Sequence, residues 1–320
     1  MRSWQGTARF ESSAVVSAPA DRAWALLGSS EAWSLSAGHA CVFEIPVQRI
    51  RLYIGIRADG RVFGMPMEIT GGDGDRHLEV QAGEQRAWRL SAEVTRRGTK
   101  LRIAGSIRVR REQVVETEAT LRESLVRWLG QIRAVLDGSR PWPSVGVPEE
   151  LRAAALDVPQ PQGALEAAVT VDLDVPVPLA GRLLRAPEVV AAGRAAAWEL
   201  AQGAGVLWSG SPPGERPGEV GALSCVVRRA GGLAGLVSVC TASSPTGYVL
   251  RQVQWPYDQI SREVTAAGAG SRLELKQRFL PRQAEVPPED YQTRAREALA
   301  DLAGSVKTAI EAAARREAGL

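Results

Sequence analysis

A short pattern that occurs twice in the chain places the strongest constraint on its fold. A strand-like segment ends at Ala18-Pro19 and is followed by "ADRAWALL", a run rich in Ala, Leu and Trp. The second half repeats this pattern in "DVPVPLAGRLL", from Asp174 to Leu184. Proline ends a strand ladder because it has no N–H to donate, and it suits the first turn of a helix. Both segments are therefore predicted to be a strand that passes directly into a short helix.

Alternation of apolar and polar residues dominates the rest of the first half and predicts strands with one dry face. The breaks "TGGDGDR" and "RRGT" are typical of hairpin turns. We therefore expect an antiparallel meander whose inward positions carry no ionisable group, and a first half that is mainly structural. Polar candidates at its edges are His39, Tyr53 and Glu118. The inward positions are Phe63, Met65, Met67, Ile69, Trp88, Leu90, Ala92, Val94, Leu101, Ile103, Ile107 and Val109.

The apolar period changes after the meander, and it does so in both halves. Residues 112–136 carry a stripe at the spacing of an amphipathic helix, which includes Leu125, Trp128 and Ile132. The second half has strand candidates at 165–175, 221–229, 233–242, 248–255, 258–266 and 271–280, and a last helix at about 288–314. Each half is therefore predicted to contain strands, a short helix and a long closing helix, which is an α+β fold.

The matched order of elements indicates a tandem duplication. Pro19, Ala23, Leu26 and Leu27 match Pro176, Ala180, Leu183 and Leu184, and "GTKLRI" matches "GSRLEL". A chain of 320 residues is long enough for two cores. We predict domains at 1–138 and 164–316, joined by a proline-rich linker at 139–163 that contains a helical turn or two.

Composition excludes several classes of function. The net charge is only +3, which gives nucleic acid little to bind. Three widely spaced cysteines and two histidines favour neither a disulfide framework nor a metal centre, and no nucleotide-binding or serine-hydrolase motif is present. No apolar run reaches membrane-spanning length and the first residues do not have the layout of a signal peptide. We expect a cytoplasmic protein with no cofactor.

The repeated strand–Ala-Pro–helix phrase, the Trp33 nearby, the Gly-Thr hairpin and the long last helix together resemble the START-like (SRPBCC, polyketide cyclase/dehydratase) superfamily. The resemblance covers nearly all of both halves. It implies two tandem helix-grip domains, in each of which a curved antiparallel sheet wraps a long C-terminal helix and encloses a cavity for apolar or amphipathic molecules.

The resemblance implies two main functions. One is a polyketide cyclase or aromatase, which acts on an intermediate that an acyl carrier protein presents. The other is a non-catalytic carrier or sensor of a lipid-like molecule, and a partner-binding adaptor is a third, less favoured reading. The aromatic-proline segment that follows the first helix in the cyclases is absent, since residues 31–43 read "EAWSLSAGHACVF". No catalytic residue of the family is therefore carried over.

The best candidate site lies in the second half. In "YVLRQVQW" the alternating set Val249, Arg251, Val253 and Trp255 places a guanidinium among apolar neighbours, where it needs a partner or a ligand oxygen. The opposite register, with Tyr248, Leu250, Gln252 and Gln254 inward, is the alternative, and it leaves Arg251 solvated. The predicted catalytic residues are Arg251, Tyr257 and Glu263, with Glu263 as the partner of Arg251. The predicted ligand-binding residues are Trp208, Cys225, Trp255, Gln277 and Phe279.

Overall fold

The chain divides into two compact units in the computed structural model. One consists of residues 1–55 and 65–146, the other of residues 56–64 and 147–320. The structure describes residues 6–36, 39–45, 49–72, 76–83, 85–144, 146–159, 164–190, 192, 205–229, 232–254, 258–280 and 288–319. No helix among these described residues is both long enough and apolar enough to cross a membrane.

The first unit is built on an antiparallel sheet in which the first strand pairs with the last. Its described strands follow the order β1-β7-β6-β5-β4-β3-β2. The strands are β1 (Gly6–Val16), β2 (Cys41–Ile45), β3 (Ile50–Ile56), β4 (Val62–Gly71), β5 (His77–Ala82), β6 (Arg86–Thr95) and β7 (Gly98–Val109). The predicted meander is present, and β2 and β3 extend it by two strands that the sequence analysis did not identify.

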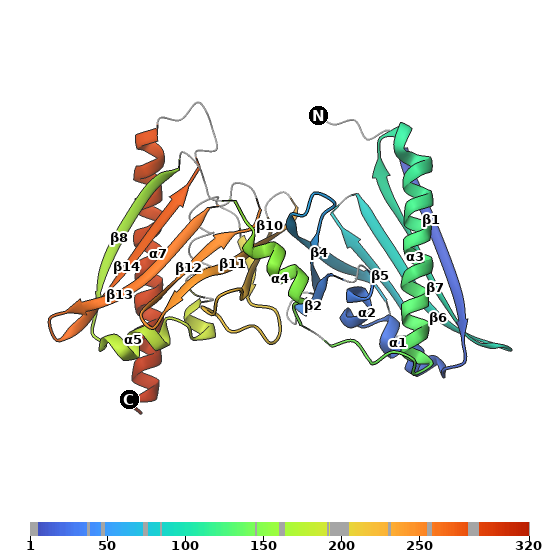
Figure 1. Cartoon of the computed structure of the whole chain (residues 1–320), viewed down its shortest axis with the longest axis horizontal. Helices are drawn as coiled ribbons and strands as arrows, with labels where there is room; N and C mark the ends of the chain where they lie inside the picture. Colours follow the sequence, from blue (N-terminus) through green and yellow to red (C-terminus); the bar gives the residue numbers. More distant parts are fainter. Residues whose placement is uncertain are drawn as a thin grey trace. The chain divides into compact units, whose positions relative to one another are not determined.

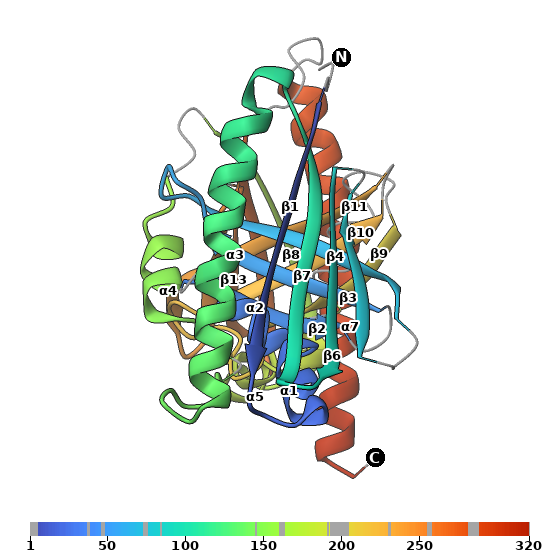
Figure 2. The ribbon, with the colours of Figure 1, turned by 90° about the vertical axis from the view of Figure 1, so that its right-hand side faces the viewer.

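One long helix, α3 (Val114–Leu136), packs along β1 and closes the first unit (Figures 1 and 2). The predicted stripe faces the sheet, since Leu125, Trp128 and Ile132 are all buried. The short helices α1 (Ala20–Leu27) and α2 (Ser30–Ser34) follow β1, and Pro19 occupies the N-cap of α1. A single 3₁₀ turn (Arg111–Gln113) precedes α3.

Three tryptophans fill the space between α3 and the sheet. The ring of Trp33 meets Trp88 and Trp128 edge to face, with centroids 5.5 and 5.2 Å apart. The indole N–H of Trp128 donates to the carbonyl of Ala32 at 2.6 Å, which ties α3 to α2. Met67 is completely buried beside them. This part of the interior is therefore a packed apolar core.

The second unit repeats the order of the first. Its described strands follow the order β8-β14-β13-β12-β11-β10-β9, and the long helix α7 (Pro288–Glu317) packs on β8 and β14 (Figure 1). The strands are β8 (Leu165–Leu173), β9 (Gly205–Gly210), β10 (Leu223–Arg229), β11 (Leu233–Ser244), β12 (Gly247–Gln252), β13 (Gln259–Ala267) and β14 (Gly270–Phe279). The short helix α5 (Val177–Leu183) follows β8 in the place of α1, again with a proline, Pro176, at the N-cap.

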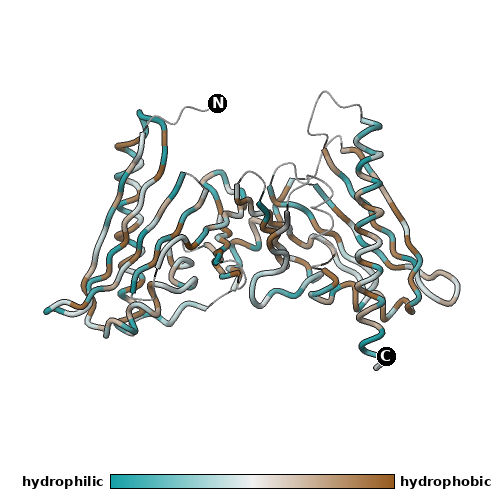
Figure 3. The backbone as a smooth tube through the Cα atoms, turned by 180° about the vertical axis from the view of Figure 1, so that it is seen from behind, coloured by the Kyte–Doolittle hydropathy of each residue, from teal (hydrophilic) through white to brown (hydrophobic). Residues whose placement is uncertain are grey.

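Each unit therefore has the helix-grip arrangement that the sequence predicts, an antiparallel sheet with a long C-terminal helix on one face. Apolar and polar residues alternate along the strands, as the bands of colour in Figure 3 show. In β1 the buried positions Ala8 and Phe10 alternate with the exposed Arg9 and Glu11. Period-two patterning thus decides which face of each strand is buried.

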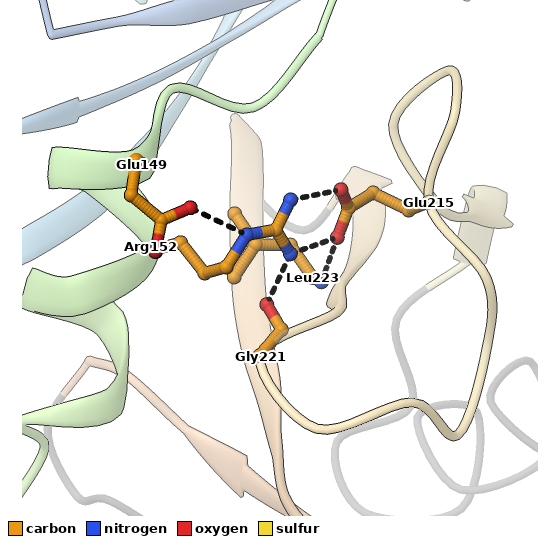
Figure 4. Close-up of polar contacts among 5 residues, drawn as sticks. All are labelled: Glu149, Arg152, Glu215, Gly221 and Leu223. Carbon is orange, nitrogen blue, oxygen red and sulfur yellow. Dashed lines mark hydrogen bonds and ion pairs between the residues drawn. The ribbon is translucent and has the colours of Figure 1, made fainter.

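The helix α4 (Glu149–Leu156) lies in the predicted linker but belongs to the second unit. Its Arg152 donates to both carboxylate oxygens of Glu215 at 3.0 and 2.8 Å and to the carbonyl of Gly221 at 2.8 Å (Figure 4). Glu215 also accepts the backbone N–H of Leu223, at 2.7 Å. These bonds fasten α4 to the segment that leads into β10.

Candidate functional site

The face of the second sheet that α7 covers is mostly apolar. Alternate positions of β12, β13 and β14 point toward α7, and the pairing of the strands sets them side by side. The buried core residues on these strands and on α7 are Tyr248, Leu250, Val264, Leu273, Leu275, Phe279, Leu299, Leu302, Ala303, Val306, Ile310 and Ala313. These residues form an apolar core on the α7 side of the sheet.

Arg262 is the exception on this apolar face. It lies on β13 between Ile260 and Val264 at the alternate positions, and only 2% of its surface is exposed. Its Nη1 donates to the hydroxyl of Tyr248 at 3.1 Å, and its guanidinium carbon lies 5.6 Å from the centroid of the Tyr248 ring. Its Nε has no partner, and no carboxylate pairs with it among the residues that the structure describes. Arg262 is thus a deeply buried cation whose only partner there is neutral.

Tyr248 stands between two guanidinium groups. The carbon of the Arg185 guanidinium lies 5.9 Å from the ring centroid, and Tyr248 is only 3% exposed. Arg185 is itself held by carbonyl oxygens of the β11–β12 hairpin, among them those of Ser244 and Gly247. The cation–ring contacts and the hydrogen bond from Arg262 fix the orientation of the phenol.

Further polar groups follow on the same face. Ser238 pairs with both Ser224 and Gln252, which makes a cross-strand row. Ser238 alternates with the core residue Cys240 along β11, so this row points toward the α7 side. Ser224 and Gln252 are 3% and 8% exposed. An apolar wall that carries a few convergent donors is the usual composition of a small-molecule site.

Arg251 lies on the opposite face of the sheet, so the predicted register is wrong and the alternative register is present. Its neighbour Leu250 pairs with Cys240, and both belong to the core formed with α7. The guanidinium of Arg251 donates to the carbonyl of Val158 and to Oε1 of Gln259, each at 3.2 Å. Burial lowers the pKa of Arg251 below its ordinary value. Two protein oxygens bind the ends of this guanidinium, and its buried Nε has no partner among the described residues.

Cys225 and Trp208 share the face of Arg251 and are also placed away from α7, contrary to prediction. Cys225 pairs with Val237 on β11, two residues from the partner of Arg251. Trp208 pairs with Val227 on the edge strand β9. Cys225 is buried there. Both side chains therefore lie on the face of the sheet opposite α7.

Glu263 is exposed and does not meet Arg251. It pairs with Gly247 and Glu274 across the ladder, whereas Arg251 pairs with Gln259, four residues earlier on β13. The predicted Arg251–Glu263 pair is therefore absent from the structure. The reason is the registry of the strands, which their alternation does not specify.

Gln277 and Phe279 are on the α7 side, as predicted. Phe279 is buried in the core, and Gln277 is half-buried opposite Ile260. Tyr257 and Trp255, the other two predicted site residues, lie outside the described residues.

The interior of the first unit contains an ionisable group, which corrects the prediction that it has none. Arg51 of β3 is 4% exposed and lies on the same face as Tyr53, which packs against the core. Its Nη2 donates to the carbonyl of Gly28, the C-cap of α1, at 2.5 Å, where a cation also complements the helix dipole. Burial lowers the pKa of Arg51 and raises that of Tyr53.

The remaining edge candidates of the first unit do not form a site. Glu118 accepts the backbone N–H of Arg9 at 2.9 Å and so joins α3 to β1. His39 is exposed. In the described part of the chain no group of three or more His, Cys, Asp or Glu side chains is placed to hold a metal ion.

Arg262 and Tyr248 were not among the predicted site residues, although the sequence held a signal for both. Arg262 takes the middle place of the alternating set Ile260, Arg262 and Val264, which has the same form as the set chosen around Arg251. The alternative register of β12 places Tyr248 inward. Only the pairing of Tyr248 with Arg262 brings the two together.

Comparisons with known proteins found matches among solved structures alone. No family model matches the chain, and no curated protein matches it. The di-domain ARO/CYC StfQ from the steffimycin biosynthetic pathway is 12% identical, with a TM-score of 0.35 over 97% of this chain and 99% of that chain. The di-domain ARO/CYC BexL from the BE-7585A biosynthetic pathway is 14% identical, with a TM-score of 0.32 over 96% and 98%. Ara h 8.0201 is 14% identical, with a TM-score of 0.34 over 46% of this chain and 98% of its own.

The class that the structure defines is a tandem helix-grip protein. The order of strands and the place of the long helix in each unit establish this fold without reference to any neighbour. At these identities and TM-scores the likeness carries no argument about what the chain binds.

Proposed function

We propose that this protein binds a polyketide-like small molecule, with carbonyl or phenolic oxygens, between α7 and the sheet of the second unit. Arg262 and Tyr248 are the polar contacts. The observation that carries the proposal is the burial of Arg262 with a single neutral partner among the described residues. The polyketide class of ligand is what the resemblance of the sequence implies.

The physical reason lies in the cost of burying a cation. A guanidinium that leaves water loses strong hydration, and only good acceptors restore it. It presents five N–H donors, of which the Tyr248 hydroxyl satisfies one. A ligand with oxygens along one edge supplies further acceptors, while its carbon skeleton packs on Leu250, Leu275 and Phe279.

Binding without turnover is the function that this geometry supports best. No carboxylate or imidazole contacts Arg262 or Tyr248 in the described part of the chain, so those residues offer no evident general base. Ring closure is the second candidate, because a guanidinium bonded to a ligand carbonyl stabilises the enolate that an aldol step requires. A base from outside the described residues would have to complete such a site.

A binding experiment tests the proposal. Quenching of tryptophan fluorescence by a hydroxyanthraquinone, such as alizarin, gives an affinity for the intact chain. We expect Arg262→Leu to weaken binding at least tenfold and Tyr248→Phe to weaken it less. The matched control is Arg272→Leu, because Arg272 is an exposed arginine on β14 whose Nε pairs with Asp172 at 2.8 Å. Equal affinities for the wild type and Arg262→Leu would contradict the proposal.

A second measurement separates the two candidate functions. A short poly-β-ketone thioester is incubated with the protein, and cyclised product is followed by mass spectrometry against a buffer blank. Binding with no acceleration supports a carrier. Acceleration that Arg262→Leu abolishes and Arg272→Leu retains supports a cyclase.

A further inference from the structure

The first sheet borders a hollow of about 560 Å³, and most of the residues that line it point away from the core. Core positions such as Phe10, Leu90 and Ile103 point toward α3. Their neighbours along the strands, including Arg89 and Arg102, point to the other face and line the hollow. Three residues of the core, Phe10, Val80 and Trp88, also border the hollow, but most of its lining belongs to the outward positions of the strands.

Small side chains form the floor of this hollow. Ala87 pairs with Ser106 across β6 and β7, and Ala104 and Ser91 lie at the neighbouring places on the same face. None of the four reaches far above the backbone. A flat molecule can therefore approach the sheet closely here.

Two ion pairs keep the floor open. Arg102 turns toward β1 and bonds both oxygens of Glu11 at 2.8 Å. Arg89 turns the other way, toward β5, and its Nε bonds Glu79 at 2.8 Å. Arg89 is the cross-strand partner of Ala104, and because its side chain points toward β5 it does not cover that alanine. The two pairs thus form opposite walls.

Positive charge is in excess at the β1 edge. Arg9 and Arg122 also line the hollow, and neither guanidinium makes an ion pair with a described residue. The carboxylate of Glu118 bonds the backbone N–H of Arg9, which sets Arg122, one helical turn later on α3, near the same edge. Glu11 and Glu79 are already paired with Arg102 and Arg89.

We propose that this hollow binds a flat organic anion. Its aromatic or acyl body lies on the floor of Ala87, Ser91, Ala104 and Ser106, and its carboxylate or phosphate group lies between Arg9 and Arg122. The volume is within the range of small-molecule sites, about 300 to 1,000 Å³. This site is in the other unit from the Arg262 site, so it is independent of the proposed function.

Calorimetric titration with 2-naphthoate, and with the neutral 2-naphthamide for comparison, tests the proposal. At low salt we expect the wild type to bind 2-naphthoate at least tenfold more tightly than 2-naphthamide. This preference should fall as the salt concentration rises, because salt screens the attraction between the anion and the arginines. Arg9→Gln together with Arg122→Gln removes the preference. Arg108→Gln retains it, because Arg108 is exposed on the same face of β7 but does not line the hollow.

Two further variants fix the location. Ala104→Leu fills the floor of the hollow and should lower the affinity for both probes at least tenfold. Ser106→Leu should have the same effect, and it replaces the first variant if Ala104→Leu alters the fold. Arg262→Leu leaves naphthoate binding unchanged. The proposal is overturned if the wild type does not bind naphthoate, if both floor variants bind it normally, or if Arg262→Leu abolishes binding.

Discussion

The buried hydroxyls of Thr99 and Ser271 make the same hydrogen bond in the two units. Thr99 donates to the carbonyl of Ala18 at 2.8 Å, and Ser271 donates to the carbonyl of Val175 at 2.7 Å. In each unit the acceptor directly precedes the proline at the N-cap of the short helix. The hydroxyl therefore anchors the point at which the first strand becomes a helix.

The glycine before each hydroxyl is required by close packing. Gly98 has φ +125°, and a Cβ on it would collide with the carbonyl of Val16. A Cβ on Gly270 would collide in the same way with the carbonyl of Leu173. The phrases "GTKLRI" and "GSRLEL" thus match because both hairpins approach the first strand of their unit at the same place.

Removing either hydroxyl should destabilise its unit. Thr99→Val and Ser271→Ala each leave a buried carbonyl without its donor, which costs about 1–3 kcal/mol of unfolding free energy. Urea denaturation measures the change. Ser13→Ala, on the exposed face of β1, is the control and should change little. Stabilities equal to the wild type in both variants would show that water replaces the bond.

Arg152 should be essential to the stability of the second unit. Arg152→Leu leaves the Glu215 carboxylate, whose side chain is 5% exposed, without its cation, and breaking a buried pair in this way costs about 3 kcal/mol. Glu149→Gln is the control, since Glu149 is 86% exposed and lies 3.6 Å from the same arginine. Thermal unfolding should show a lower Tm for the first variant only.

The same contacts bear on where the second domain begins, which remains a prediction. We propose a start near residue 147 in place of 164, because Leu151 and Ala155 of α4 are completely buried. A chain of residues 147–320 should then unfold at a higher temperature than one of residues 164–320. Equal transitions would favour the linker assignment of 139–163.

Met67 should be among the most sensitive core positions of the first unit. It is completely buried in the cluster that holds the three tryptophans, so Met67→Ala should cost about 2–5 kcal/mol through lost contacts and a cavity. Met65 is half-buried on the same face, and Met65→Ala should cost less. A denaturation midpoint that falls equally in both variants would argue against this core.

Cys240 should make stability depend on pH in the alkaline range. Burial raises the pKa of its thiol, so the folded state holds the proton where the unfolded state releases it. The contribution is complete below the ordinary thiol pKa and is lost as pH rises toward the raised value. The loss of stability from pH 7 to pH 10 should be smaller in Cys240→Ala than in the wild type. An equal loss in both would exclude Cys240 as its source.

The sequence by itself determined most of the elements and their order. Alternation along β6 and β7, the apolar stripe of α3 and the prolines before α1 and α5 are local signals, because the geometry of a strand or helix fixes which neighbours share a face. The repeat then followed from the matched phrases. β2, β3 and β9 were missed, since they are not strictly alternating; in β2 even the consecutive residues Cys41, Val42 and Phe43 are all buried.

Only the tertiary structure decided which face of the second sheet meets α7. The strand β10 is buried on both faces, from Leu223 to Val227, so a period-two pattern there and in β12 does not distinguish inside from outside. Strand pairing resolved it by setting Tyr248 opposite Arg262 and Arg251 opposite Gln259. A shift of one residue exchanges the two faces, and long-range pairing, not local sequence, fixes that register.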